Sequence, residues 1–245
     1  MNTSGLENLD ILKNKLLQHY DIKYFKNIVN IITSISEEYY FSEYYDILIE
    51  FDIKTPYSNI FFNLYDLKYN QSRINDVIKL QFNGKVFARL DTCSTNPNKP
   101  YTNAQEILDD ISTNERTKYV TDNTHKIILR EYINLTGYIE IRCFIEDKKL
   151  RGITSTDENN EEPTNIILTL IKKLVDKIVF YSEFDNCTLD FAVNNITNDC
   201  ILIEINTPCW LCATSGFFDL SLSSDIEILF GLYKPEYINY PVLKF

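Results

Sequence analysis

Hydrophobic and polar positions follow two different periods along the chain, and the period changes near residue 79. Before this point apolar residues recur at helical spacing, as in YFKNIVNIITSISEEYYFSEYY, which predicts helices over 6–19 and 24–48. After it, β-branched and aromatic residues come in short runs that are typical of strands. The pattern therefore predicts a helical N-terminal part, 1–78, followed by an α+β part, 79–245, that forms one compact unit.

Proline, glycine and asparagine mark the expected connections. Pro56 and the aromatic run IFFNLY predict a loop with short extended pieces over 55–65, and the polar stretch 70–78 predicts a further loop. Asn83-Gly84 favours a hairpin turn between the strands IKLQF and KVFARLDT. STNPNKP, at 94–100, predicts another loop because of its Pro and Asn residues.

The remaining sequence alternates between strands and two helices. Apolar spacing predicts helices over 103–112 and 163–180, and Pro163 suits the first turn of the second one. Strands are expected in HKIILREYI, YIEIRCFIED and KLRGITST, and in the pair CTLDFAVNN and DCILIEIN, which the short polar turn 194–199 joins. Strands joined by such short turns predict antiparallel sheets.

The last strand pair carries the most informative polar residues. Strict alternation places Ile201, Ile203 and Ile205 on one face of the last strand and leaves Glu204 and Asn206 on the other. Pairing with the preceding strand as a hairpin would bring Asp190 to the same patch. Two carboxylates and an amide oxygen form a ligand set that Mg²⁺ takes together with substrate phosphates. An exposed polar sheet face gives the same pattern, so periodicity alone leaves both interpretations open.

Basic residues on the preceding strands add to this picture. Arg89, Arg130 and Arg142 each lie in or at the end of an apolar strand. They could be surface salt-bridge partners, but an arginine in the middle of an apolar strand is rarely buried without a partner. Residues 79–151 hold 12 basic and 10 acidic residues, whereas 152–245 hold 5 and 14. A basic middle and an acidic end fit a site for a polyanion and its cation, or ordinary surface variation.

Composition excludes several classes of protein. The chain has 245 residues, 44% of them hydrophobic, and a formal net charge of −11. Hydrophobicity at this level argues against disorder, and the acidic balance argues against binding to nucleic acid polymers or anionic membrane surfaces. The N-terminus lacks the pattern of a secretory signal, and no apolar run approaches the ~18 residues of a membrane helix. We therefore expect a cytoplasmic location.

The six cysteines are expected to be reduced and mostly buried. Cys209 and Cys212 form a CxxC pair, but it follows a late strand, whereas a redox pair is expected after the first strand of a βαβ unit. The gaps to Cys187 and Cys200 match no common zinc pattern. The two histidines lie far apart in sequence, which leaves a histidine-based metal site or triad unsupported.

VFARLDTCS, ILREYI, EIRCFIEDKKLRGIT and EINTP together resemble the cell division cycle protein 123 family, a branch of the ATP-grasp fold. The resemblance covers about residues 80–230 and implies a two-lobed α+β fold with antiparallel sheets. The sequence departs from the family pattern at STNPNKP, where the family has a tighter Ser-Pro-Lys-Asp segment. It also has Glu204 where the family has Asp, and Thr207 separates Asn206 from Pro208.

The resemblance implies a role for individual residues in binding Mg-ATP. Arg89 and Lys99 would approach the phosphates, and Arg142 would meet the triphosphate across from the metal. Asp190, Glu204 and Asn206 would hold Mg²⁺. The adenine hinge would be lined by Arg130, Glu131, Tyr132 and Ile133. No catalytic residue is implied, because family members act mainly as ATP-binding assembly factors.

Three functions are compatible with these residues. The family resemblance implies an assembly chaperone for the eukaryotic translation initiation factor 2 complex that holds its gamma subunit. The wider fold suggests a carboxylate-amine ligase that acts through an acyl phosphate. The altered STNPNKP segment suggests an interaction module that binds no nucleotide. We rank them in this order.

Overall fold

The computed structural model describes residues 41–91, 94, 99–115, 117–118, 126–155, 162–181, 185–206 and 242–244. They belong to two compact units, one formed by Tyr40–Asn134 and the other including the chain from Leu135 onward. Residue 78, where the sequence suggested a change between parts, lies inside a helix of the first unit. The helix expected over 6–19 and the CxxC pair lie outside the described residues.

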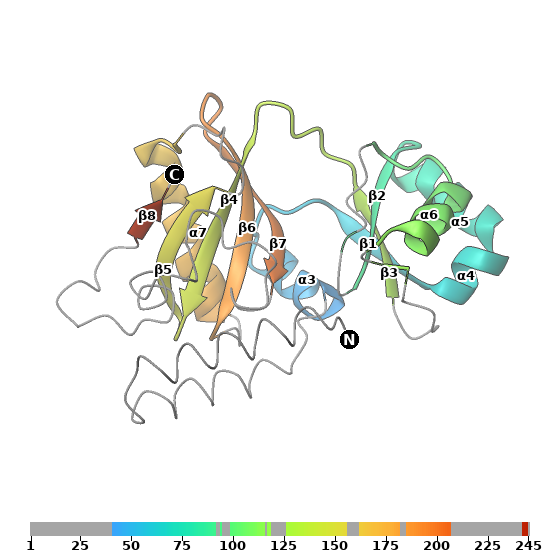
Figure 1. Cartoon of the computed structure of the whole chain (residues 1–245), viewed down its shortest axis with the longest axis horizontal. Helices are drawn as coiled ribbons and strands as arrows, with labels where there is room; N and C mark the ends of the chain where they lie inside the picture. The colour runs from blue at the N-terminus through green and yellow to red at the C-terminus, as the bar shows by residue number, and fades with distance from the viewer. Residues whose placement is uncertain are drawn as a thin grey trace. The chain divides into compact units, whose positions relative to one another are not determined.

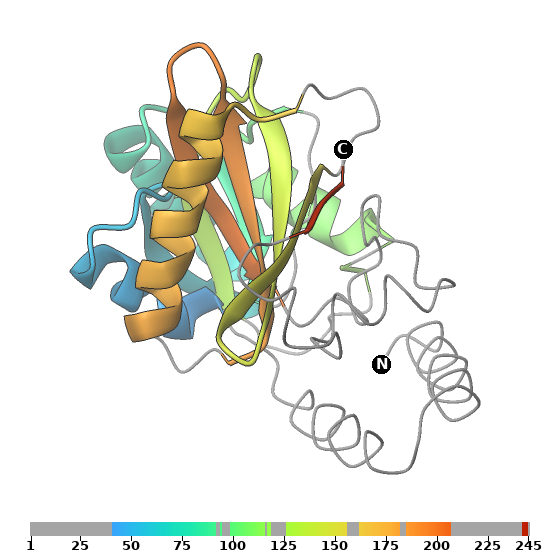
Figure 2. The same cartoon turned by 90° about the vertical axis from the view of Figure 1, so that its left-hand side faces the viewer.

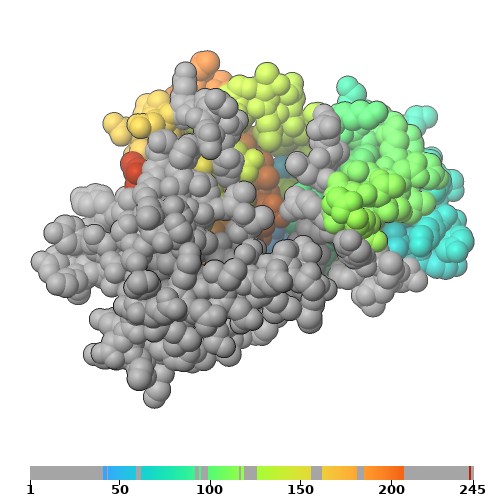
Figure 3. Space-filling model, in the orientation of Figure 1, coloured from blue at the N-terminus to red at the C-terminus, as the bar shows by residue number. Residues whose placement is uncertain are grey.

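The first unit contains a three-stranded antiparallel sheet in the order β1-β3-β2 (Figure 1). Its strands are β1 (Ser58–Asn63), β2 (Val86–Leu90) and β3 (Lys126–Glu131). Its helices are α3 (Phe41–Glu50), α4 (Leu64–Tyr69), α5 (Gln71–Gln81) and α6 (Ala104–Thr113). Figure 3 shows α6, in green, at the surface of this unit.

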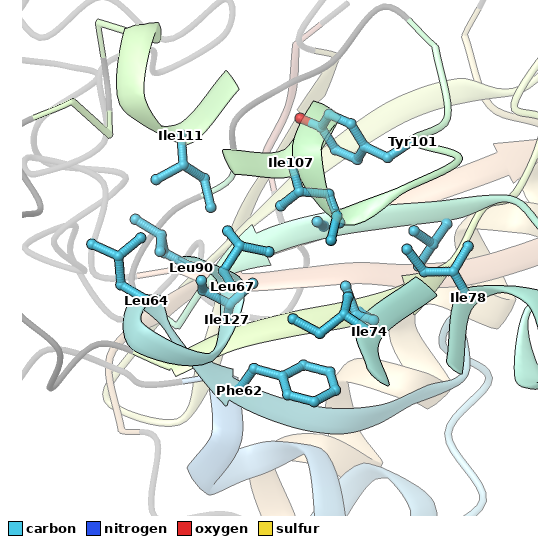
Figure 4. Packing of buried hydrophobic residues seen from close by; sticks show 14 of the residues in the cluster. Phe62, Leu64, Leu67, Ile74, Ile78, Leu90, Tyr101, Ile107, Ile111 and Ile127 are labelled. Atoms are coloured by element: carbon cyan, nitrogen blue, oxygen red, sulfur yellow. The ribbon is translucent and has the colours of Figure 1, made fainter. Parts of the chain in front are cut away.

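Alternation along the strands explains how this unit is built. Val86, Ala88 and Leu90 of β2 lie in one buried cluster with Ile127 and Leu129 of β3. Side chains of α4, α5 and α6 complete the cluster (Figure 4). The intervening strand residues face the other side of the sheet. The two arginines of these strands are therefore placed opposite the hydrophobic core.

Two predictions around residue 80 were wrong. The stretch 70–78 is not a loop, and IKLQF is not a strand, because α5 spans Gln71–Gln81 and buries Ile74 and Ile78 completely. These residues are four apart and share one helix face. Burial of this face against the core stabilises the helix, although its other positions are mostly polar. Asn83 and Gly84 have φ values of 52° and 80° and turn the chain from α5 into β2, not between two strands.

The second unit contains a five-stranded sheet in the order β7-β6-β4-β5-β8. β4, β5, β6 and β7 pair in antiparallel fashion, and β8 is parallel to β5. Helix α7 covers one face of the sheet with a buried side that includes Ile167, Ile171 and Val175 (Figure 2). The elements are β4 (Ile139–Glu146), β5 (Lys149–Ser155), α7 (Asn165–Tyr181), β6 (Cys187–Asn194), β7 (Asp199–Asn206) and β8 (Val242–Lys244).

The fold confirms the expected α+β class with antiparallel sheets. The helices expected over 103–112 and 163–180 are present within two residues of their predicted ends, and so are the five later strands. Cys143, Cys187 and Cys200 are buried, as expected. Within the described residues, no helix is both long and apolar enough to cross a membrane.

Candidate nucleotide and metal site

Three neighbouring strands of the second unit bring together four of the predicted site residues. Arg142 of β4 pairs with Asp190 of β6, and Asp190 pairs in turn with Glu204 of β7. Asn206 of β7 lies two pairs further along, opposite Thr188. Residues directly opposite each other in a sheet point to the same face, so these side chains form one polar patch. Figure 1 shows the three strands that carry it, β4, β6 and β7.

A β-bulge sets this arrangement, and it corrects the expected alternation. The register shifts between Asp190 and Phe191, because Asp190 pairs with Glu204 whereas Phe191 pairs with Leu202. Ile203 is therefore the extra residue, and it is half-buried, whereas Leu202 is buried. A regular ladder would place Ile203 opposite Asp190. The extra residue instead turns Glu204 toward the face of Asp190, since a shift of one residue exchanges the two faces of a strand.

Arg142 and Asp190 form a buried ion pair at the centre of the patch. Arg142 Nε donates to Asp190 Oδ1 at 2.7 Å, and Arg142 Nη2 donates to Asp190 Oδ2 at 2.8 Å. Asn206 Nδ2 donates to the same Oδ2 at 2.8 Å. The side chains of Arg142 and Asp190 are only 11% and 4% exposed. A two-point contact of this kind holds both groups in one orientation.

The charges of the patch act on Asp190 in opposite directions. Burial raises the pKa of Asp190, the hydrogen bonds and charge of Arg142 lower it, and the charge of Glu204 raises it again. The net pKa is above the ordinary value for an aspartate. The ionised carboxylate suits this pair best, because the guanidinium group has only donors to offer and both carboxylate oxygens then accept.

The donor set of the patch fits a hard cation such as Mg²⁺. Asp190 and Glu204 supply carboxylate oxygens, and the Asn206 amide oxygen points away from Asp190 because its nitrogen donates there. Among the described residues, no three His, Cys, Asp or Glu side chains form a metal-binding group. Two carboxylates and one amide provide fewer ligands than a metal site in which the protein supplies every ligand. They suit an ion that keeps waters and shares substrate phosphates.

Glu146 is a second buried carboxyl group on the same strand and face as Arg142. Glu146 is only 5% exposed. Burial raises its pKa to about 8, the charge of Arg151 acts against this shift, and Asp147 adds to it. A bulge at Arg151 interrupts the pairing of β4 with β5 at this point. The sequence pattern did not single out Glu146.

Arg89 and Arg130 meet on the sheet of the first unit. The Arg89 and Arg130 guanidinium groups lie 5.1 and 4.6 Å from the centre of the Phe41 ring of α3. Both arginines are 2% exposed. Arg130 also donates to Ser58 Oγ at 3.1 Å. The predicted roles of Arg89 at the phosphates and of Arg130 at the hinge stay predictions. Sequence reasoning did not single out Phe41, which lies in the aromatic run YYFSEYY.

The predicted hinge begins with the last two residues of β3 and continues beyond its end. Glu131 and Tyr132 are exposed and line a cavity of about 410 Å³. Ile133 is half-buried and does not line this cavity. Lys99 is exposed and lies just before Tyr101, which pairs with Val86. The other lining residues, which the sequence did not single out, are Tyr57, Gln81, Phe82, Asn83 and Lys85.

Comparison with solved structures defines the class of fold. The chain matches the structure of Cdc123 from Schizosaccharomyces pombe with a TM-score of 0.65 at 18% identity, over 83% of this chain and 93% of that one. It also matches a RimK domain ATP-grasp protein from Sphaerobacter thermophilus with a TM-score of 0.51 at 12% identity, over 79% and 66% of the two chains. The fold is therefore ATP-grasp-like.

Sequence comparison identifies the family within this class. A profile of the D123 family matches residues 92–218, about half of the chain. The chain belongs to this family, the family of cell division cycle protein 123. Cell division cycle protein 123 of Yarrowia lipolytica is 30% identical over 41% of this chain and 32% of its own length. The aligned part thus spans about a third of that relative.

Proposed function

We propose that this chain binds the magnesium complex of ATP and acts as an assembly chaperone for the eukaryotic translation initiation factor 2 complex through its gamma subunit. The observation that carries the proposal is the patch of Arg142, Asp190, Glu204 and Asn206 on neighbouring strands of an ATP-grasp-like chain. Membership of the cell division cycle protein 123 family supports the proposed partner. We place this activity in the cytoplasm.

Each residue of the patch has a distinct part in the proposed binding. Glu204 and the Asn206 amide oxygen would hold the cation, with Asp190 as the third ligand. Mg²⁺, when bound, would neutralise charge on the phosphates. The planar donors of Arg142 match phosphate oxygens as well as they match the carboxylate of Asp190. Arg89 and Lys99 are proposed phosphate contacts, and the cavity at Glu131 and Tyr132 is proposed to take the base.

Calorimetric titration with Mg-ATP tests the nucleotide part of the proposal. Glu204→Gln is the sharper variant, because Glu204 is half-buried and lies outside the Arg142–Asp190 ion pair. We expect it to weaken binding at least tenfold, since it removes one anionic ligand. Asp176→Asn is the matched control, because it removes the same charge from the exposed side of α7. Equal binding by wild type and Glu204→Gln would contradict the proposed metal site.

A pull-down with the gamma subunit tests the partner. We expect capture that depends on Mg-ATP and is reduced by Glu204→Gln but not by Asp176→Asn. Absence of any ATP-dependent capture would overturn the chaperone function while leaving nucleotide binding intact. ADP release that rises sharply with one carboxylate and one amine would instead favour the ligase. Absence of Mg-ATP binding by the wild type would favour the interaction module that binds no nucleotide.

A further inference from the structure

The Arg142–Asp190 ion pair uses most of the acceptor capacity of a proposed cation ligand. Asp190 Oδ2 accepts from both Arg142 Nη2 and Asn206 Nδ2, and Oδ1 accepts from Arg142 Nε. A carboxylate offers about four lone-pair positions, two on each oxygen. These three hydrogen bonds fill both positions of Oδ2 and one position of Oδ1. A cation at this patch would therefore have to share Asp190 with a guanidinium group in direct contact.

Charge opposes that sharing when the cation comes alone. Arg142 is permanently ionised, and its side chain is 11% exposed, so little water screens its positive charge. With Arg142 in place, its positive charge offsets the negative charge of Asp190, and the patch then attracts a free cation less strongly. One carboxylate and an amide oxygen form a weak site for a free divalent cation.

A phosphate group changes this balance because it competes for the same donors. Guanidinium groups bind phosphate oxygens through the same planar two-point contact that Arg142 makes with Asp190. A phosphate that takes over part of this contact would release Asp190 oxygens to the cation. The phosphate would also supply further oxygen ligands.

We propose that Arg142 is a positioning residue that acts as a lock on the metal site, so that Asp190 becomes a cation ligand only when phosphate arrives with the cation. This inference rests on the proposed binding of Mg-ATP and concerns its regulation. The site would then remain without metal in the absence of nucleotide. Cation and nucleotide would bind together, each strengthening the other.

Binding of Mn²⁺ alone to the full chain, followed by electron paramagnetic resonance, tests the lock. We expect Arg142→Gln to bind Mn²⁺ at least tenfold more tightly than the wild type, because the variant removes the positive charge that offsets Asp190. Arg142→Lys keeps the cation and should bind Mn²⁺ as weakly as the wild type. Adding Glu204→Gln to Arg142→Gln should remove the gained site. Equal Mn²⁺ affinity in wild type and Arg142→Gln would overturn the lock.

Thermal unfolding of the wild type provides a second measurement that does not depend on the variants folding. We expect Mn²⁺ alone to leave the melting temperature unchanged, and Mn²⁺ with a non-hydrolysable ATP analogue to raise it. A rise with Mn²⁺ alone that equals the rise with both would overturn the lock even if Mg-ATP binds. Failure of the wild type to bind Mg-ATP, together with a Mn²⁺ site gained in Arg142→Gln, would overturn the nucleotide proposal and retain the block on free cation.

Discussion

Replacing Asp190 by Asn should destabilise the chain far more than loss of one surface charge. Asn has nearly the same shape as Asp, but it removes the carboxylate that pairs with the buried positive charge of Arg142. The side chains of Arg142 and Asp190 are 11% and 4% exposed, and two charge-assisted hydrogen bonds of 2.7 and 2.8 Å join them. Solvent screening is therefore small, and breaking such a pair costs about 3–5 kcal/mol.

Urea unfolding followed by circular dichroism measures this cost. A loss of about 3–5 kcal/mol corresponds to a fall in melting temperature of roughly 6–20 °C for a chain of this size. Asp185→Asn is the matched control, because Asp185 forms an ion pair with Lys148 in the same unit but is 63% exposed, with Nζ and Oδ1 3.3 Å apart. The control should change stability by less than about 1 kcal/mol.

A double variant separates the cost of an unpaired charge from the value of the pair itself. Arg142→Met combined with Asp190→Leu removes both charges and keeps the patch filled with side chains of similar volume. Replacements of this kind in other buried pairs are close to neutral or stabilising. We expect the double variant to be more stable than Asp190→Asn. The argument is refuted if Asp190→Asn costs no more than Asp185→Asn.

Two further predictions concern other buried charges. Burial raises the pKa of Glu146 in the folded chain to about 8, against an ordinary value of 4.5. The stability that Glu146 contributes is therefore fully present below pH 4.5 and is lost as pH rises through 8. The free energy of unfolding of Glu146→Gln should gain roughly 4 kcal/mol on that of wild type between pH 5 and pH 8, measured by urea unfolding at each pH. Phe41→Leu should lower the free energy of unfolding by about 1–4 kcal/mol in the same assay, because the Arg89 and Arg130 guanidinium groups lie over the Phe41 ring. Equal stability of this variant and wild type would show that these contacts contribute nothing.

Hydrophobic spacing predicted most of the elements, and it failed where two periods were compatible with the same residues. IKLQF contains β-branched and aromatic residues suited to a strand, yet its first residue, Ile78, belongs to a helix face with Ile74. Burial against the core of the first unit decides between the two, and that core is formed by residues distant in sequence. Asn83-Gly84 correctly predicted a turn with positive φ values. These two residues alone do not indicate whether the turn joins two strands or a helix and a strand.

The candidate patch was predicted as a set, but its geometry depends on a feature that alternation does not contain. Asp190, Glu204 and Asn206 were expected to share a face, and the structure places them on neighbouring paired strands. They share it because Ile203 is an extra residue in β7, which no spacing rule predicts. The pairing of Arg142 with Asp190 required knowing that β4 lies beside β6, although 48 residues separate them.

The same contacts that stabilise the second unit also limit which variants can test its function. Asp190 is both half of a buried ion pair and a proposed cation ligand, so its substitution changes folding and binding together. Glu204 is half-buried and makes no part of that pair, so its substitution changes the charge of the patch while Arg142 keeps its partner. A loss of Mg-ATP binding in Glu204→Gln with unchanged urea unfolding would therefore separate the metal site from the fold. The same loss in Asp190→Asn would not make this separation.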